Sequence, residues 1–242
     1  MNSTAEAWEA KYRRSRTVNI VLGVIAAFLA VVVAAQLMTG PDSSSSEAAE
    51  GQSTSGDAEM DFVRRDAEDP MAIGDVDAPI VMTYFFDTRC PFCAVFHRDT
   101  LPTLIEEYVD AGDLRIEFHD VVFYGDQSAD AAVAARAAAE QGMFTQYLSA
   151  VYDAAPENGH PDMPRDKLIG FAEEVGIPDL EQFTTDLEDP DLLAEVEASA
   201  QQAQQAGVTA VPFFVIGQTA VSGAQPVDSF RQFIDQSLTE RE

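Results

Sequence analysis

The sequence is poor in positive charge. Of its 242 residues, 14 are Lys or Arg and 42 are Asp or Glu, which gives a formal net charge of −28. Lys11 and Lys167 are the only lysines. A chain this acidic repels phosphate backbones, so nucleic-acid binding is excluded as the expected function. The acidic residues are interpreted as a solvated surface rather than as a site for basic partners.

Cysteine and histidine are also scarce. The chain has two cysteines, Cys90 and Cys93, and three histidines. The absence of a second cysteine pair excludes a disulfide framework and a four-cysteine zinc site. The sequence contains no internal repeat. Both cysteines lie within one helical turn, in "TRCPFCAVF" (88–96), and that spacing needs an explanation.

One long run of the sequence is entirely uncharged and mostly apolar, in contrast to the acidic remainder. Residues 18–38, "VNIVLGVIAAFLAVVVAAQLM", carry no charge in 21 positions, and a helix of that length spans about 30 Å, the thickness of a hydrocarbon core. A cleaved signal peptide is the alternative, but its apolar region is normally about 7–15 residues, and "QLMTG" is a poor cleavage site. The run therefore predicts an uncleaved, single-pass transmembrane helix.

The flanks of this run predict its orientation. Residues 1–17 carry four basic side chains and two acidic ones, and a basic flank places the N-terminus in the cytoplasm. Residues 39–61 are rich in Ser, Gly and acid, which is typical of a flexible linker. Residues 62–242 are then expected to form a folded domain outside the cytoplasm, tethered to the cell membrane.

The folded part begins with a β-α-β pattern. Residues 78–86, "APIVMTYFF", form a short apolar run typical of a buried strand. A helical pattern follows, which Pro102 should kink and Gly112 should end. Residues 114–123 alternate apolar and polar positions and predict a second strand. Because the whole unit takes about 45 residues, a parallel pair with a right-handed crossover is expected.

Helical patterns fill residues 128–206, with glycine and Asp-Pro signals at their ends. Residues 211–217 and 219–224 then predict a hairpin around Gly217, and residues 227–238 predict a last amphipathic helix. The fold class is α/β, with strands on both sides of a block of helices.

Two conventional roles for Cys90 and Cys93 explain their spacing poorly. A structural disulfide that closes a four-residue loop would stabilise the fold by only roughly 2 kcal/mol in the chain-entropy model. A zinc site could use Cys90, Cys93 and His97, but it would need a fourth ligand, and His119 and His160 are the only other histidines. A Cys–His hydrolase is disfavoured because the second thiol would form a disulfide with the nucleophile.

Redox chemistry explains the spacing best. A cysteine at a helix N-terminus lies near free backbone N–H groups, which stabilise its thiolate, and Pro91 costs no hydrogen bond there. Arg89 is expected to add a positive charge beside Cys90. The sulfur of Cys90 should be exposed and reactive, whereas Cys93 should be covered. A reversible disulfide between Cys90 and Cys93 is therefore expected, with no cofactor and no metal.

At these residues the chain resembles the DsbA-like branch of the thioredoxin superfamily. The resemblance covers residues 62–238 and rests on four segments: "DVDAPIVMTYFFDTRCPFC", "LPTLIEEYVDAGDLRIEFHDV", "SADAAVAARAAAEQGMFTQYLSAVY" and "GVTAVPFFVIGQTAVSGAQP". It implies a thioredoxin fold, a mixed sheet flanked by helices, with a helical insertion at about residues 128–206. It also implies clients among secreted proteins and a membrane partner of the quinone-reducing DsbB or VKOR type that reoxidises the chain.

The resemblance assigns further site residues. It implies that the Val211–Pro212 bond is cis and faces the cysteines, and that Val211 offers backbone groups to a client. Phe92 is either a hydrophobic client contact or a partly buried filler. Where relatives often carry a buried acid, this chain has Tyr84. Asp87 is the nearest acid to Cys90.

Three neighbouring aromatic residues, Tyr84, Phe85 and Phe86, are expected in the core, and His97 on the helix surface.

Three functions remain open at this point. The leading interpretation is a membrane-tethered thiol–disulfide oxidoreductase that forms disulfides in secreted or cell-envelope proteins through Cys-Pro-Phe-Cys. A reductase or isomerase would use the same two thiols at a lower reduction potential. A non-enzymatic, anchored metal-binding module with a thioredoxin-like fold is the third.

Overall fold

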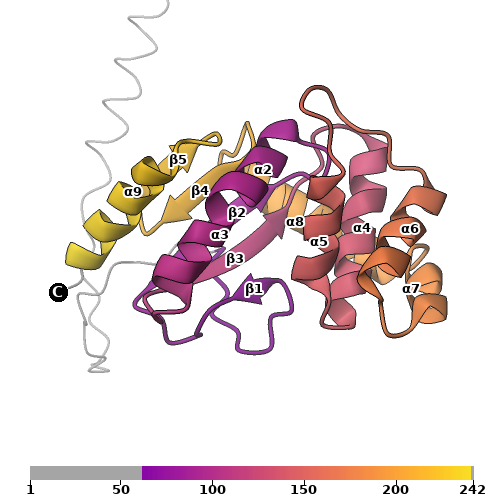
Figure 1. Cartoon of the computed structure of the whole chain (residues 1–242), viewed down its shortest axis with the longest axis horizontal. Coiled ribbons are helices and arrows are strands. Elements are labelled where there is room, and N and C mark those ends of the chain that lie inside the picture. The colour runs from indigo at the N-terminus through magenta and orange to yellow at the C-terminus, as the bar shows by residue number, and fades with distance from the viewer. Residues whose placement is uncertain (1–61, 241–242) are drawn as a thin grey trace, which may run out of the picture. The chain divides into compact units, whose positions relative to one another are not determined.

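A five-stranded mixed sheet forms the centre of the folded domain. The computed structural model describes residues 62–240, and its strands are arranged in the order β1-β3-β2-β4-β5 (Figure 1). The strands are β1 Ala72–Ile73, β2 Ile80–Phe86, β3 Leu114–Asp120, β4 Phe213–Ile216 and β5 Thr219–Ser222. Strands β2 and β3 are parallel, and the other neighbours are antiparallel. The predicted parallel pair and the predicted hairpin are both confirmed.

Strand β2 lies between β3 and β4 and is buried along its whole length. β-branched and aromatic side chains suit such a two-sided burial. Tyr84 is paired with Phe118 on β3 and with Phe214 on β4, and its ring stacks on that of Phe214 at 4.8 Å between centroids. The expected core positions of Tyr84, Phe85 and Phe86 are confirmed, since each is 0% exposed.

A long irregular helix follows β2. It consists of α2 Pro91–Val95, the π-helical turn η1 Phe96–Thr100, α3 Leu101–Leu104 and the π-helical turn η2 Ile105–Val109. Pro102 lacks an N–H group and cannot continue the regular hydrogen-bond pattern. Instead of the simple kink that the sequence predicts, the structure has wider π-helical turns on both sides of the segment that contains Pro102.

Five helices form the insertion between β3 and β4, as the sequence predicts. They are α4 Asp126–Glu140, α5 Phe144–Asp153, α6 Arg165–Val175, α7 Leu180–Asp186 and α8 Pro190–Gln205. Helix α4 is rich in alanine and buries nine of its residues, because small side chains allow α5, α7 and α8 to pack closely around it. The C-cap Gly176 adopts the left-handed conformation, at φ 71°.

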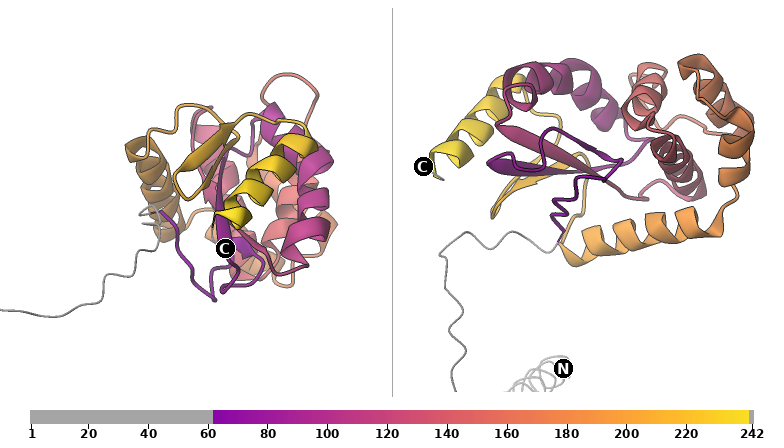
Figure 2. Two further views of the ribbon diagram at one scale, coloured as in Figure 1. Left: turned by 90° about the vertical axis from the view of Figure 1, so that its left-hand side faces the viewer. Right: turned by 90° about the horizontal axis from the view of Figure 1, so that it is seen from below.

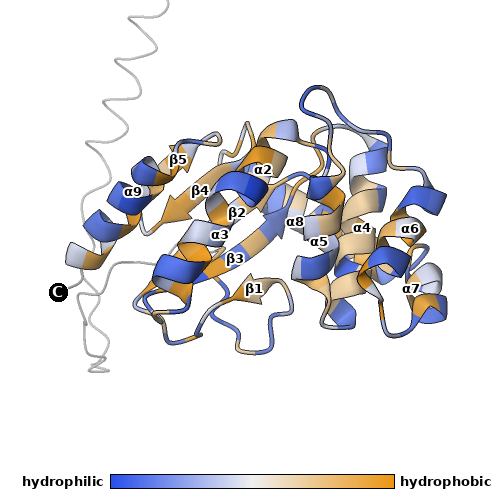
Figure 3. Cartoon of the chain, viewed as in Figure 1, coloured by the Kyte–Doolittle hydropathy of each residue, from blue (hydrophilic) through white to orange (hydrophobic). Residues whose placement is uncertain are grey.

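The helices cover both faces of the sheet. Helix α8 crosses one face, while α2, α3 and the C-terminal helix α9 Val227–Thr239 lie on the other (Figure 2). The central strands β2 and β4 are mostly hydrophobic, whereas helices such as α3, α5 and α9 carry both hydrophilic and hydrophobic residues (Figure 3). The amino-terminal end of α2 therefore projects from the end of a rigid, apolar sheet.

Strand β1 is the element that the sequence does not predict. It has two residues, too few for a recognisable alternation, and it pairs with Ile116 and Glu117 of β3. The chain then turns at Gly74, where φ is 92° and a Cβ atom would lie 2.5 Å from the carbonyl oxygen of Leu114. Glycine is required at this close approach.

Some of the predicted regions lie outside the described residues. These are the basic N-terminus at 1–17, the transmembrane helix at 18–38 and the linker at 39–61. Within residues 62–240, none of the helices combines the length and the apolar character that a membrane span requires.

Candidate active site

Cys90 lies at the N-terminus of α2, directly after β2. It is the N-cap residue, with extended backbone angles of φ −79° and ψ 119°, and Pro91 is the first helical residue. The backbone N–H of Cys90 donates to the Asp87 carbonyl at 3.0 Å, and the Cys90 carbonyl accepts from the Ala94 N–H at 3.1 Å. The strand-to-helix turn therefore fixes the position of this cysteine, as the sequence predicts.

The predicted exposure of Cys90 is wrong. Cys90 is 1% exposed and Cys93 is 0% exposed, and both are free thiols. The cause is a segment that is distant in sequence: the Cys90 thiol donates to the Val211 carbonyl oxygen at 3.5 Å. The sequence argument considered only the helix end and did not include the loop that packs over it.

That loop contains the cis peptide bond between Val211 and Pro212. The conformation that the resemblance implies is thus confirmed, and so is the position of the loop opposite the cysteines. Pro212 ends the loop and Phe213 begins β4, so the proline occupies no ladder position in the sheet. The catalytic role of Pro212 and the client-binding role of Val211 stay predictions.

The two thiols have opposite acidities. The pKa of Cys90 is lowered to about 7, first by a hydrogen bond from the Cys93 side chain, against the effect of burial, and further by the backbone N–H groups of Cys93 and Phe92 and by the Tyr124 side chain. The pKa of Cys93 is raised well above its usual value, chiefly by burial. Cys90 is therefore the thiol that ionises near neutral pH, and thiolate is the reactive form.

Arg89 does not act as the sequence predicts. Its guanidinium group donates from Nε to the Pro161 carbonyl at 2.7 Å and from Nη1 to the Tyr124 carbonyl at 2.6 Å. Arg89 is thus committed to two backbone carbonyls of neighbouring loops. The contacts that lower the pKa of Cys90 come instead from Cys93, from helix N–H groups and from Tyr124.

Asp87 joins the active-site turn to the loop after β3. Its carboxylate is 0% exposed and accepts hydrogen bonds from the Arg89 N–H, the Phe123 N–H and the Ser128 hydroxyl at 2.8, 2.8 and 3.0 Å. Burial raises its pKa, although these hydrogen bonds partly oppose the shift. Asp87 is therefore a structural link in the turn that carries Cys90.

Tyr84 lies beneath Cys93 at the centre of the apolar face. Its hydroxyl is buried and has no hydrogen-bond partner of normal geometry, yet it interacts with the Cys93 thiol and the Tyr152 hydroxyl. Burial raises the pKa of Tyr84 well above its usual value, so it stays protonated. The position where the resemblance implies a buried acid is thus occupied by a neutral hydroxyl.

His97 is buried, which corrects the expectation of a surface position. It is 7% exposed, its Nε2 atom lies 3.0 Å from the Ser149 hydroxyl, and its ring packs on Tyr152 at 5.0 Å. The helix α5 covers it, and burial lowers its pKa to about 4. Within residues 62–240, no three His, Cys, Asp or Glu side chains form a group that could hold a metal ion.

Phe92 is the most exposed large apolar side chain of the described domain, at 64%. It lines a cavity of about 750 Å³ whose wall also includes Phe123, Tyr124 and Val211. Of the two roles that the sequence leaves open for Phe92, the filler role does not fit this exposure. An apolar surface beside a reactive thiol is suited to contact with another protein.

Sequence reasoning missed Tyr124 and His160. Tyr124 follows β3 and His160 lies in the loop between α5 and α6, and their rings stack at 3.6 Å between centroids. Neither loop has a periodic pattern. The only available signal was the presence of His160 among three histidines.

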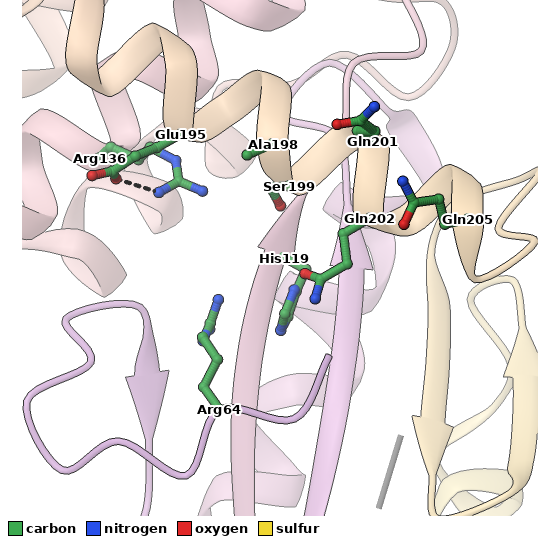
Figure 4. Close-up of a pocket in the computed structure, with 9 residues that line it drawn as sticks. All are labelled: Arg64, His119, Arg136, Glu195, Ala198, Ser199, Gln201, Gln202 and Gln205. Carbon is green, nitrogen blue, oxygen red and sulfur yellow. Dashed lines mark hydrogen bonds and ion pairs between the residues drawn. The ribbon is translucent and has the colours of Figure 1, made fainter. Parts of the chain in front are cut away.

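A polar cavity lies on the face of the sheet that helix α8 crosses (Figure 4). Its lining includes Arg64, His119 and Arg136. The Arg136 guanidinium is paired with Asp120 at 2.7 Å and with Glu195 at 2.8 Å, and Arg64 with Asp69 at 2.6 Å. Because the two arginines are already paired with carboxylates, this cavity is a weaker anion site than its composition indicates.

The acidity of Cys90 predicts a pH-dependent stability of the reduced protein. Its pKa in the folded state is about 7, below the ordinary value of about 8.5 expected in the unfolded state. The Cys90 thiolate therefore stabilises the folded state fully above about pH 8.5, and this contribution is lost as the pH falls through 7. The reduced chain should lose about 1.5 kcal/mol between about pH 8.5 and pH 6, relative to the oxidised chain.

Denaturant unfolding of both redox forms at each pH measures this difference. The oxidised chain is the control, because it retains all other titrating groups and lacks only the two thiols. Above about pH 8.5 the raised pKa of Cys93 acts in the opposite direction, so the measurement stops there. A constant difference between the two forms would show that the Cys90 thiolate is not stabilised.

Comparisons with known proteins agree with this geometry. The family model described as Thioredoxin matches residues 66–236. The chain is 28% identical over 171 residues to a probable disulfide bond formation protein D of Bacillus cereus, which covers 69% of this chain and 78% of that protein. It is 23% identical to the disulfide bond formation protein D of Bacillus subtilis over 168 residues, 69% of this chain and 76% of that protein.

A solved structure is similar in fold. The crystal structure of oxidised BdbD from Bacillus subtilis superimposes with a TM-score of 0.65 at 22% identity, over 70% of this chain and 92% of that one.

Proposed function

The chain belongs to the thioredoxin family, and from that premise we propose that it forms disulfides in secreted or cell-envelope proteins through Cys90 and Cys93. It is a DsbA-like protein thiol–disulfide oxidoreductase, since its relatives are named disulfide bond formation proteins and protein-disulfide oxidoreductases. The proposal concerns two points: that the reaction runs in the direction of client oxidation, and that Cys90 and Cys93 carry it out.

The observation that carries the proposal is the opposite acidity of the two thiols. The pKa of Cys90 is lowered to about 7 and that of Cys93 is raised. A stabilised Cys90 thiolate stabilises the reduced form, and this makes the disulfide a stronger oxidant. The same acidity makes Cys90 a good leaving group when the client disulfide forms. Thioredoxin has a thiol pKa of about 7 as well, so it is the reduction potential that separates an oxidase from a reductase.

The reaction transfers two electrons from the client to the chain. A client thiolate attacks the Cys90 sulfur of the Cys90–Cys93 disulfide, and Cys93 leaves and takes up a proton. A second client thiolate then attacks the client sulfur of the mixed disulfide, and Cys90 leaves as a thiolate. The client disulfide forms and both cysteines are reduced. A quinone-linked membrane protein of the DsbB or VKOR type would restore the disulfide.

This proposal is tested by mixing the oxidised full chain with a reduced peptide that contains two cysteines. One equivalent of chain should oxidise one equivalent of peptide, with the loss of two peptide thiols and the appearance of two protein thiols. A chain that leaves the peptide reduced, while its reduced form readily reduces disulfides, would support the reductase instead.

We further propose that residues 18–38 anchor the enzyme in the cell membrane with the N-terminus in the cytoplasm. The support is the uncharged run of 21 residues and the basic residues before it. An extracytoplasmic site also suits a disulfide, which cytoplasmic thiols would reduce. A reporter fused after Glu242 should be active only outside the cytoplasm, and the membrane-bound protein should retain Met1. A mature chain that starts near Gly40 would contradict the anchor.

The apolar cavity beside the thiols predicts a specific effect of Phe92. Phe92→Ala should raise the KM for a peptide client about fivefold and leave the turnover rate nearly unchanged, because burial of part of a Phe side chain contributes about 1 kcal/mol. Leu193→Ala is the matched control, since Leu193 is also exposed, at 40%, but lies outside this cavity. Equal KM values for both variants would show that Phe92 does not contribute to client binding.

A further inference from the structure

The two carboxylate oxygens of the buried Asp87 have different tasks. Oδ1 accepts from the Arg89 N–H at 2.8 Å and from the Ser128 hydroxyl at 3.0 Å. The contact to a backbone N–H two residues further on is an Asx turn, which an aspartate or an asparagine can form. Oδ2 accepts from the Phe123 N–H at 2.8 Å. The turn that carries Cys90 therefore needs only Oδ1, whereas Oδ2 bonds to a loop that is distant in sequence.

The negative charge of Asp87 has no role in the turn itself. The side chain is 0% exposed, and the three donors that bond to it are uncharged groups. Burial of a carboxylate on neutral donors costs free energy, and an asparagine would supply the Oδ1 acceptor without that cost. The contact that an asparagine cannot supply at the same time is the second acceptor, which faces Phe123.

Phe123 is the point at which this loop meets the cavity beside the thiols. It is 42% exposed and lines that cavity together with Phe92 and Val211. The Val211 carbonyl in turn accepts from the Cys90 thiol at 3.5 Å. None of the described residues that line this cavity is charged. Aromatic, uncharged walls suit a bulky apolar side chain of a client, placed beside the cysteine that reacts.

Asp87 connects two walls of this cavity. Phe92 lies on α2, directly after the active-site turn, and Phe123 lies on the loop after β3. One carboxylate bonds to the backbone of both segments, through the Arg89 N–H and the Phe123 N–H. The position of the Phe123 wall relative to Cys90 is therefore fixed by a buried contact behind the cavity.

We propose that Asp87 is a positioning residue for client selection, and that Phe123 is the specificity-determining residue through which it acts. Oδ2 of Asp87 holds Phe123 at the distance from Cys90 that admits a bulky apolar side chain, so the chain prefers clients with such a side chain beside the reacting cysteine. This inference rests on the proposed function for the identity of the clients. Asp87 takes no part in the exchange of electrons or protons.

Asp87→Asn tests the inference because it separates the two oxygens. The amide oxygen is expected at the Oδ1 position, where two donors point, and the amide NH₂ group then faces the Phe123 N–H and cannot accept from it. The assay uses two reduced peptides with two cysteines each, identical except for Phe or Ala beside the first cysteine. The wild-type full chain should oxidise the Phe peptide with a kcat/KM about fivefold higher, mainly through KM.

In Asp87→Asn this ratio should fall below about twofold, and in Phe123→Ala it should fall equally. The double variant should show no further loss, because both changes act on the same contact. Ser128→Ala is the matched control: it removes a donor to Oδ1 but leaves the Phe123 contact, and it should retain a ratio of about fivefold. A purely structural role of Asp87 would lower the rates for both peptides and leave their ratio unchanged.

An unchanged ratio in Asp87→Asn, or an equal loss in Ser128→Ala, would overturn the inference. If Asp87→Asn does not fold, Asp87→Ser carries the same test, since a hydroxyl can replace Oδ1 in the turn but offers no second oxygen. A wild-type chain that oxidises neither peptide would overturn the proposed function instead. The ratio is then measured for the reduction of the two oxidised peptides, because the same cavity receives the client in either direction.

Discussion

Replacement of Cys93 by Ser should turn the protein into a covalent trap for its clients. In this variant the Cys90 thiol remains acidic enough to form mixed disulfides, but no second thiol is available to resolve them. Cys90→Ser should lose turnover down to the rate of uncatalysed thiol exchange and should trap few clients, because Cys93 is fully buried and its pKa is raised. Non-reducing gels of both variants, expressed as full chains, measure the adducts.

The double variant, with Ser at both positions, is the control and should give no adducts. Because Cys90 and Cys93 are 1% and 0% exposed, their difference in acidity, rather than in exposure, is what this experiment tests. If Cys90→Ser traps as many clients as Cys93→Ser, or if iodoacetamide labels Cys93 first, the roles are reversed. The helix-terminus argument for Cys90 would then fail.

The second large effect is expected at Phe96, which anchors the active-site helix to the sheet. Its ring packs at 4.4 Å from Phe214, 4.9 Å from Tyr84 and 5.1 Å from Phe230, measured between centroids, and it is 0% exposed. Phe96→Ala should therefore destabilise the protein by about 3–5 kcal/mol, since the removed ring leaves a cavity in a rigid aromatic cluster. Urea unfolding of the oxidised chain measures the loss.

Two controls identify the cause of that loss. Phe96→Leu keeps most of the volume and should cost less than about 1.5 kcal/mol. Phe92→Ala removes the same side chain four residues earlier, where the ring is 64% exposed, and should change the stability by less than about 0.5 kcal/mol. Equal destabilisation by Phe96→Ala and Phe92→Ala would contradict the packing described here.

Much of the fold could be predicted because its elements have clear periods. The apolar run of β2, the alternation in β3 and the helical patterns of the insertion all indicated their elements, and Asp179 and Asp189 cap α7 and α8 as their sequence signals predict. Strand β1 could not be predicted, because two residues show no alternation. Its pairing depends on β3, which is more than forty positions away.

The site was predicted in its residues but not in its environment. The helix end placed Cys90 and Cys93, and the resemblance supplied the cis bond at Pro212. The burial of Cys90 depends on the Val211 loop, and the burial of His97 depends on helix α5. Both segments are distant in sequence, so local sequence patterns do not predict these contacts. Arg89 illustrates the same limit: its position beside Cys90 predicted a charge contact, but two distant carbonyls bind its guanidinium group.

The equilibrium reduction potential of the Cys90–Cys93 disulfide tests the central claim most directly. Stabilisation of the Cys90 thiolate should place it above about −200 mV, toward the value of about −120 mV of strongly oxidising relatives. The measurement equilibrates the full chain with glutathione buffers at pH 7 and quantifies the two redox forms. A value near −270 mV, that of thioredoxin, would contradict the account and would assign the protein to the reductases.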